Sequence, residues 1–348
     1  MHDQLIRLDN FLNGYEKSSH GIFCSKEKAA GYWSNLDKRE NDELIKGLDA
    51  YPSAKEALIN KHPQYYDIIF SPKREAGLEL LELKGDEACI DYGCMWGALT
   101  IPLAKRVGFV LGVDQTLQSL ILLKKRISDE KLTNVDLLCE DLNKMPAVKE
   151  KFDIAIINGV LEWIPETGEI ELKKYYGKKS RKRYSASPKD MQIAFLRKAH
   201  ASLKENGKLY LAIENRHDFK MFMGLKDPHA NLMFTSILPR WLANFVSIAR
   251  LGRPYINWTY SFTGTRDILK RAGFKSMELY CCFPDYHFPE FISRYDQRLE
   301  GFNPTVPLRN DDGKVVPRRL ARVAAELFLF RYLKAKSVAP AIIAIARK

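Results

Sequence analysis

The segment Ala88–Ala104 (ACIDYGCMWGALTIPLA) limits the possible folds more than any other part of the 348-residue sequence. It begins within a short apolar run, 87–92, that predicts a strand with an acid near its end. Gly93 and Gly97 follow, and residues 98–106 have a helical pattern. Glycine permits a sharp turn and a close approach of a ligand to the backbone. Because the N-terminus of a helix favours an anionic group, the segment predicts a ligand-binding turn.

The rest of the chain alternates between strand and helix patterns. Apolar runs predict strands at 109–114, 135–139, 152–158, 208–214 and 276–283. Nearly continuous apolar strands separated by helices are typical of a parallel sheet that is covered on both faces. Right-handed crossovers then give a doubly wound α/β fold. A last apolar stretch, 338–346, contains Pro340, which suits an edge strand or the start of a strand.

Polar residues at the predicted strand ends indicate the ligand. Asp91 precedes the first glycine and would repel a pyrophosphate, but it can receive an ammonium group, while the helix N-terminus favours a carboxylate. The methionyl part of S-adenosylmethionine carries both groups. Asp114 ends the second strand, where an acid would hydrogen-bond ribose hydroxyls. Asp141 suits the adenine amino group, and Asn158-Gly159 should line the cleft near the sulfonium.

These segments resemble the class I S-adenosylmethionine-dependent methyltransferases. DYGCMWG is similar to their D/E-x-G-x-G-x-G loop, with Met95 at the middle glycine, and GVD, CEDL, FDIAIINGVLEWIP and LKENGKLYLAIEN resemble the blocks that follow. The resemblance covers 85–283 and the terminal strand. It implies an enzyme with a Rossmann-like, doubly wound sheet of seven strands, the last one antiparallel between the fifth and sixth, plus helical caps. It also implies S-adenosyl-L-methionine as cofactor, bound by Asp91, Gly93, Gly97, Asp114, Asp141, Leu142, Asn158 and Gly159.

A narrower resemblance concerns the acceptor. NGVLEWI, AIENRHDFKMFMG, KDPHAN and FPDYHFP are similar to segments of methyltransferases encoded beside glycosyltransferases in bacterial cell-surface polysaccharide clusters. Those carry IENR-x-G, E-D-H and PDYK-x-P blocks. Here Asp218 replaces the glycine, His287 replaces the lysine, and Asp227-Pro228-His229 changes the acid-to-histidine spacing. The resemblance implies methylation of a hydroxyl of a saccharide or lipid-linked glycan. The alternatives are an RNA methyltransferase and a non-catalytic binding subunit with a methyltransferase fold.

A hydroxyl acceptor benefits from a general base within hydrogen-bond reach. The candidates are Glu214, His229 and His287. Glu162 is a further carboxylate near the predicted cleft, although Glu162 and Arg216 are as compatible with structural roles, such as capping helices or pairing across the cleft. No metal is expected, because none of the six cysteines forms a C-x-x-C pair of the kind that zinc sites use. Buried free thiols in a reducing compartment are the prediction for them.

The chain divides into two predicted regions. Residues 1–70 are expected to form an N-terminal helical cap, and 71–348 a methyltransferase domain with insertions at 165–190, 215–264 and 284–337. Ser71-Pro72 is expected to cap the helix that opens the domain. The insertion 215–264 is rich in aromatic residues, which either stack on a sugar ring or build a small core of their own.

The net charge of +12 predicts anionic partners or surfaces. Seven cations and no acid lie within 173–183, and the segment 314–348 carries nine basic residues and one acid. A solvated surface explains such runs, as does contact with phosphate groups of a lipid carrier or an anionic membrane; nucleic acid is a weaker expectation. No apolar stretch of 18 residues and no secretory leader is found, so the expected location is the cytoplasm, with peripheral contact to the inner membrane.

Overall fold

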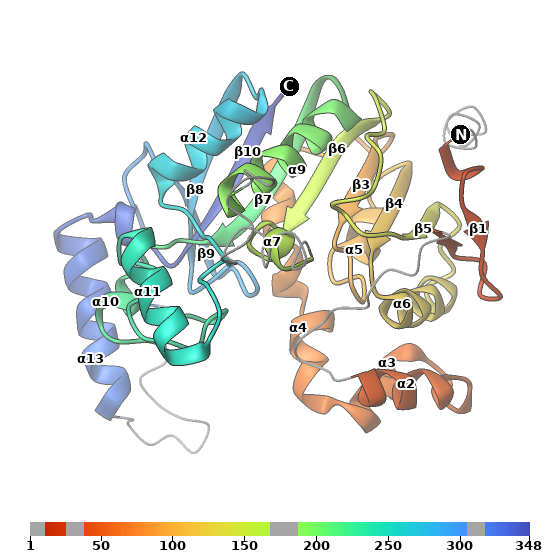
Figure 1. Cartoon of the computed structure of the whole chain (residues 1–348), viewed down its shortest axis with the longest axis horizontal. Coiled ribbons are helices and arrows are strands. Elements are labelled where there is room, and N and C mark those ends of the chain that lie inside the picture. The colour runs from red at the N-terminus through yellow and green to blue at the C-terminus, as the bar shows by residue number, and fades with distance from the viewer. Residues whose placement is uncertain (1–10, 26–37, 168–186, 305–316) are drawn as a thin grey trace.

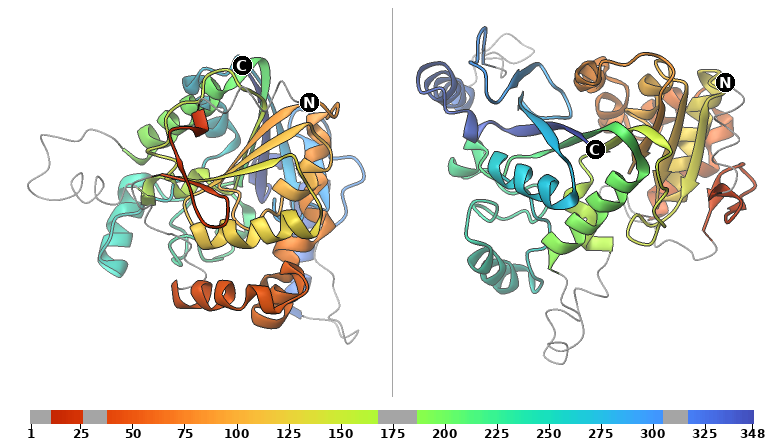
Figure 2. Two further views of the ribbon diagram at one scale, coloured as in Figure 1. Left: turned by 90° about the vertical axis from the view of Figure 1, so that its right-hand side faces the viewer. Right: turned by 90° about the horizontal axis from the view of Figure 1, so that it is seen from above.

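The computed structural model describes residues 11–25, 38–167, 187–304 and 317–348 (Figures 1 and 2). Its centre is one sheet with the strand order β1-β2-β5-β4-β3-β6-β7-β10-β8-β9. The strands are β1 (Glu16–Lys17), β2 (Phe23–Cys24), β3 (Ala88–Tyr92), β4 (Phe109–Asp114), β5 (Val135–Cys139), β6 (Phe152–Asn158), β7 (Leu203–Glu214), β8 (Ser276–Phe283), β9 (Phe291–Arg294) and β10 (Ala341–Arg347).

Helices connect these strands and cover the sheet. The α-helices are α2 (Lys38–Lys46), α3 (Ala54–Lys61), α4 (Tyr66–Phe70), α5 (Thr100–Ala104), α6 (Leu117–Asp129), α7 (Ile164–Thr167), α9 (Pro188–Ser202), α10 (Phe219–Phe222), α11 (Arg240–Leu251), α12 (Phe262–Ala272) and α13 (Pro317–Glu326). Shorter or differently wound turns are η1 (Leu48–Ala50), η2 (Pro63–Tyr65), η3 (Pro72–Leu81), η4 (Leu161–Trp163), η5 (Leu327–Tyr332) and η6 (Lys336–Val338).

The central strands lie where the apolar runs predicted them, except that β7 begins five residues before the predicted 208–214. Strands β5, β4, β3, β6 and β7 are mutually parallel. Both faces of the sheet are buried, as a doubly wound fold requires. On β6, Ala155 and Ile157 contribute to one core cluster, which includes residues of α9 and α12. Ile154 and Ile156 contribute to a second core, which includes residues of η3, α5 and α6. Successive side chains therefore serve opposite layers.

The last strand, β10, lies between β7 and β8 and is antiparallel to both. It begins directly after Pro340, so the residue without a backbone donor stands at the entry to the strand and not within its ladder. The expected count of seven strands is wrong for the described residues, because β1, β2 and β9 widen the sheet to ten. All six cysteines are free, and five of them are buried.

The N-terminal region is only partly the helical cap that was predicted. Helices α2, α3 and α4 pack with Trp96 and Leu122 in a separate apolar cluster. The segment before them instead forms the β1–β2 hairpin, which extends the sheet beside β5. The predicted cap at Ser71 is present, since its hydroxyl accepts a hydrogen bond from the backbone N–H of Lys73, although the helix that follows is 3-10.

The insertion 215–264 forms a small unit of its own around α10 and α11. Ala230, Ala243 and Tyr255 make a local core there. Figure 1 shows this unit and α2–α4 below the sheet, on the side toward which β6 runs. The basic run 173–183 falls outside the described residues. Within the described ranges, no helix has the length and apolar character needed to cross a bilayer.

Candidate active site

A cavity of about 660 Å³ lies at the carboxyl ends of β4, β3, β6 and β7. These strands are neighbours in the sheet, at spacings of about 4.8 Å, so Asp114 on β4 and Glu214 on β7 are separated by three strand spacings, roughly 14 Å. The predicted cofactor residues that line the cavity are Asp91, Gly93, Asp114, Leu142, Asn158 and Gly159. Gly97 and Asp141 are not among its lining residues.

The turn after β3 shows why glycine is needed at both predicted positions. Gly93 has a φ of +72°, and a Cβ there would lie 2.4 Å from Cγ2 of Val160. Gly97 has a φ of +77° and would clash with the side chain of Leu123 on α6, so its role is to pack the turn against a helix. Met95 also adopts a positive φ, of 47°, in place of the resembled family's middle glycine. At this position the chain therefore uses the left-handed region without a glycine.

Two carboxylates face the cavity beside this turn, Asp91 buried and Asp114 partly buried. Asp91 accepts a hydrogen bond of 2.6 Å from the hydroxyl of Thr100, and burial raises its pKa to about 7. Asp114 accepts hydrogen bonds from the backbone N–H groups of Met95 and Thr116, at 2.9 and 2.8 Å. Burial also raises the pKa of Asp114. Both acids would gain from a polar or cationic ligand that replaces the lost water.

Arg74 is a lining residue that the sequence did not single out. It belongs to η3, directly before β3, and its Nε and Nη1 atoms are buried without a hydrogen-bond partner among the described residues. Burial lowers its pKa. In the sequence, Arg74 is visible only as an arginine before the first central strand. Its distance along the chain from that strand does not distinguish it from a cation on the surface. The guanidinium of Arg74 and the carboxylate of Asp91 line the same cavity. One cation and one anion are suited to the carboxylate and ammonium groups of a zwitterion.

Asp141 takes part in the turn after β5. Its Oδ1 accepts a hydrogen bond of 2.9 Å from the backbone N–H of Asn143, so the carboxylate supports the turn after β5. The next residue, Leu142, faces the cavity instead. The predicted contact of Asp141 with an adenine amino group therefore stays a prediction.

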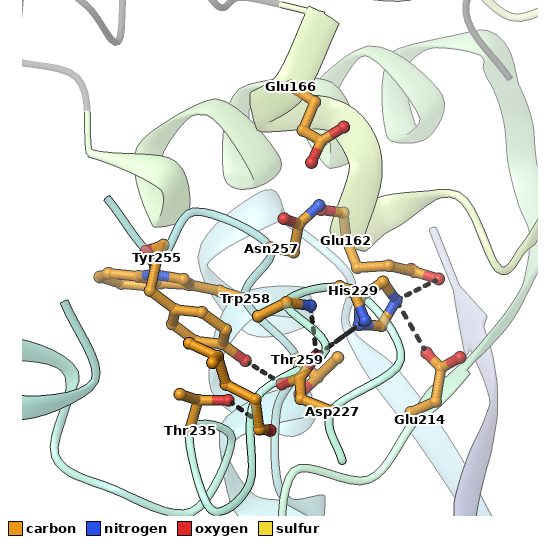
Figure 3. Close-up of polar contacts among 12 residues, drawn as sticks. Glu162, Glu166, Glu214, Asp227, His229, Thr235, Tyr255, Asn257, Trp258 and Thr259 are labelled. Atoms are coloured by element: carbon orange, nitrogen blue, oxygen red, sulfur yellow. Dashed lines mark hydrogen bonds and ion pairs between the residues drawn. The ribbon is translucent and has the colours of Figure 1, made fainter. Parts of the chain in front are cut away.

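A carboxylate–histidine cluster lies at the β7 end of the cavity (Figure 3). His229 Nε2 lies 3.8 Å from Oε1 of Glu162 and 3.8 Å from Oε2 of Glu214. Glu162 follows β6, Glu214 ends β7, and His229 comes from the insertion 215–264. Folding thus brings together two of the three predicted base candidates and the additional carboxylate Glu162. Glu162 is fully buried.

The other side of the His229 ring faces Asp227. Nδ1 lies 3.3 Å from Oδ1 of Asp227. Asp227 is itself fixed, because it accepts hydrogen bonds from the Tyr255 hydroxyl at 2.6 Å and from the His229 backbone N–H at 2.8 Å. The ring of Trp163 packs edge-on against the imidazole, with centroids 4.9 Å apart. The imidazole is therefore oriented by its surroundings.

Electrostatics give the three base candidates different protonation behaviour. Burial opposes the charged form of His229, but Glu214, Asp227 and Glu162 together raise its pKa well above the ordinary value. Burial, followed by the charge of Glu162, raises the pKa of Glu214. Burial and the charge of Arg74 lower the pKa of His287. Of the two histidines, only His287 is thus expected to be neutral near pH 7.

His287 lines the cavity but is held differently from His229. Its ring stacks on Tyr286, with centroids 4.2 Å apart, and the Tyr286 hydroxyl donates a hydrogen bond of 3.0 Å to Oε1 of Glu214. Arg216, by contrast, donates to the backbone carbonyls of Ser236 and Leu238, which matches the structural role left open for it.

Comparison with known proteins finds similarity to methyltransferases. Residues 83–231 match a family model described as "Methyltransferase domain". The chain is 26% identical over 162 residues to a probable ribosomal RNA small subunit methyltransferase A of Methanosphaera stadtmanae, covering 47% of this chain and 56% of that protein. It is 27% identical over 143 residues to a ubiquinone biosynthesis O-methyltransferase of Coxiella burnetii, covering 41% and 49%. The chain thus spans about half the length of these curated relatives.

Solved structures include a putative methyltransferase of Bacillus halodurans. It is 16% identical, covers 79% of this chain and 98% of its own, and has a TM-score of 0.42. The segment that matches the methyltransferase domain includes the turn after β3, Asp91, Asp114, Glu162, Glu214 and His229. Arg74 and His287 lie outside it.

Proposed function

We propose that this chain is an S-adenosylmethionine-dependent methyltransferase that acts on a hydroxyl group. The observation that carries the proposal is the single cavity that presents Asp91 and the orphaned Arg74 guanidinium together with Asp114. An amino-acid zwitterion needs one anion and one cation, and a ribose needs a carboxylate at the end of the next strand. The matched methyltransferase domain supports the same ligand.

The donor, when bound, supplies a methyl group that is already activated by a sulfonium. The chain's residues then position and deprotonate the acceptor. Asp91 receives the ammonium group, Arg74 the carboxylate and Asp114 the ribose hydroxyls. The acceptor hydroxyl enters at the Glu162–Glu214–His229 cluster. His287, neutral at pH 7, would take the proton of this hydroxyl when the methyl group is transferred to its oxygen.

A hydroxyl of a saccharide or lipid-linked glycan is the acceptor we propose. Its support is the resemblance of the acceptor-side segments. The exposed side chains of Trp241 and Phe245 on α11 would also suit a substrate held at a membrane. A relative that is named an O-methyltransferase supports a hydroxyl acceptor in general. RNA is the second candidate, favoured by the net charge of +12 and by a relative named as a ribosomal RNA methyltransferase.

Calorimetry with S-adenosylmethionine tests the cofactor. We expect binding by the wild type and an affinity loss of about tenfold or more in Arg74→Gln, because a charged hydrogen bond is removed. Arg106→Gln, which changes a surface arginine paired with Glu79, is the matched control. Absence of binding by the wild type would favour the alternative of a non-catalytic binding subunit.

Transfer of a radiolabelled methyl group tests the acceptor. The enzyme and labelled donor are incubated separately with a bacterial glycolipid extract, with soluble polysaccharide and with total RNA. Label that stays with the glycan after lipid cleavage supports the proposed acceptor. Label in nuclease-sensitive RNA, with salt-sensitive RNA binding, would replace it with the second candidate.

A further inference from the structure

The cluster of Glu162, Glu214 and His229 has the donor atoms of a cation site, at separations somewhat wider than those around a bound cation. One ligand atom from each residue lies within 4.8 Å of the other two. In an octahedral site with bonds of about 2.1 Å, neighbouring ligand atoms are about 3 Å apart. The observed separations exceed this by an amount that small side-chain rotations can close. Two carboxylates and one imidazole are ligands for Mg²⁺-like or borderline divalent cations.

The buried carboxylate of Glu162 is a second observation that points to a cation, independent of the spacing of the three residues. The residue has no exposed surface, and neither of its oxygens has a hydrogen-bond donor within the described ranges. Burial of an ionised carboxylate without donors is costly, and native proteins rarely leave such groups unsatisfied. Oε2 of Glu214 is likewise buried without a donor in the described part of the chain. Both carboxylates point toward Nε2 of His229 (Figure 3).

Asp227 lies on the side of the His229 ring that faces away from the two glutamates. Its position 3.3 Å from Nδ1 of His229 favours a proton on that nitrogen, so a cation that displaces the proton between Nε2 and the two glutamates would gain Nε2 as a ligand. A histidine ligand whose far nitrogen faces a carboxylate is a recurrent feature of metal sites. Asp227 is in turn fixed by the Tyr255 hydroxyl.

We propose that Glu162, Glu214 and His229 bind one divalent cation at the β7 end of the cavity. Resting on the proposed function, the inference assigns the cation a role: it binds the acceptor oxygen and lowers the pKa of the hydroxyl, so that His287 can take the proton. The expectation of no metal came from the lack of closely spaced ligands. These three residues come from segments that lie apart in the sequence and meet only in the fold.

Titration of the full chain with Mn²⁺ tests binding directly. After treatment with EDTA and removal of the chelator, electron paramagnetic resonance follows the loss of free Mn²⁺. We expect one site per chain and an affinity lowered at least tenfold in Glu162→Gln, which keeps the shape of the side chain but removes its charge. Glu166→Gln is the matched control, because Glu166 lines the same cavity but pairs with Arg253 at 3.6 Å. We expect Glu166→Gln to bind Mn²⁺ as the wild type does.

A thermal melt of each variant without metal shows whether it is folded. The inference is overturned if the wild type binds no Mn²⁺ at millimolar concentration, or if a folded Glu162→Gln binds it as well as the wild type. The proposed function is judged separately. If S-adenosylmethionine binding and methyl transfer persist in EDTA, the proposed role of the cation is wrong and the proposed methyltransferase function stands. If the protein binds Mn²⁺ but has no affinity for S-adenosylmethionine, the cation site stands and the proposed function is wrong.

Discussion

Asp91 carries a cost in folding stability that its proposed ligand would offset. Burial raises its pKa from 3.8 to about 7. Between these pH values the folded protein holds a proton that the unfolded chain has lost, so stability falls as the pH rises through this window. We expect Asp91→Asn to raise the free energy of unfolding at pH 8 by ~1–3 kcal/mol and to weaken binding of S-adenosylmethionine about tenfold or more. Urea unfolding and calorimetry at pH 8 measure the two effects.

The control for Asp91 is Asp153→Asn at the opposite end of the sheet. Asp153 accepts a hydrogen bond of 2.9 Å from the Ala88 N–H and pairs with Lys204. Its replacement should lower stability and leave cofactor affinity unchanged. In the wild type, affinity should rise between about pH 6 and 8, since the ionised form of Asp91 receives the ammonium group. An affinity that is independent of pH in this range would contradict the assignment.

His287 should determine how the turnover rate depends on pH. Burial and Arg74 lower its pKa from 6.5, so its neutral form dominates above that value and is lost on acidification. At saturating donor, we expect kcat to rise with pH to a plateau, with a midpoint below 6.5. His287→Gln should reduce kcat by about 10²–10⁴-fold and abolish this dependence. A His287→Gln enzyme that keeps the wild-type profile would show that the proton leaves by another route.

At the residue scale, what the sequence could predict depended on position along a strand. Asp114 and Asn158 could be located because a polar residue that ends an apolar run stands at the edge of a parallel sheet. Arg74 could not, because its importance comes from burial beside Asp91, which no local pattern encodes. Glu162 was recognisable as a carboxylate near the cleft, but its approach to His229 depends on how the insertion folds back.

Helix α3 provides a prediction at the scale of one element. Leu58 is fully buried in the cluster that holds α2–α4 against Trp96, whereas its neighbour Ile59 is 42% exposed. We expect Leu58→Ala to lower the free energy of unfolding by about 2–5 kcal/mol and Ile59→Ala by less than about 1 kcal/mol. Urea unfolding of both variants measures the difference.

The same pair of variants tests whether the N-terminal helices shape the cavity. Ile68 and Ile69 at α4 line it, so loosening the cluster should also weaken donor binding in Leu58→Ala. Ile59→Ala should bind like the wild type. Equal stability of the two variants would mean that these helices do not pack as described.

Elements with many apolar residues were predicted well, and short ones were not. Strands β3 to β6 have five to seven residues each, enough for a continuous apolar run to be visible. Strands β1 and β2 have two residues each, and so few side chains carry no periodicity. β2 forms by pairing with β5, a long-range contact that the local sequence cannot report, and β1 pairs with β2.

For the whole molecule, the basic surplus is concentrated in two segments of the chain, whereas the cavity is lined by both acids and arginines. The cavity presents Asp91 and Asp114, as a cationic donor needs. The segments 173–183 and 314–348 together carry more positive charge than the net +12 of the chain. We expect this basic surplus to serve delivery of the acceptor or docking on a surface.

Exposed apolar side chains are as unevenly distributed as the charge. Among the described residues, nearly all large hydrophobic side chains with high exposure lie within 222–251 and 320–333. On α11, Trp241 and Phe245 are 73% and 68% exposed and stand one turn apart on one face. Asp227, which is buried, is the single acid within 219–260, whereas five basic residues lie there. An apolar stripe flanked by cations suits an anionic bilayer surface.

We therefore expect the protein to sediment with vesicles that contain phosphatidylglycerol and to remain in solution with purely zwitterionic vesicles. Trp241→Ser combined with Phe245→Ser should reduce the bound fraction severalfold, because the side chains that would enter the interface are lost. Ile59→Ser, an exposed apolar position on α3, is the control and should bind like the wild type. Equal sedimentation of the double variant and the wild type would mean that electrostatic attraction alone holds the protein at the vesicle. In that case, neutral substitutions across 173–183 should abolish sedimentation. If neither change matters, the acceptor reaches the cavity from solution, and the apolar face of α11 has another purpose.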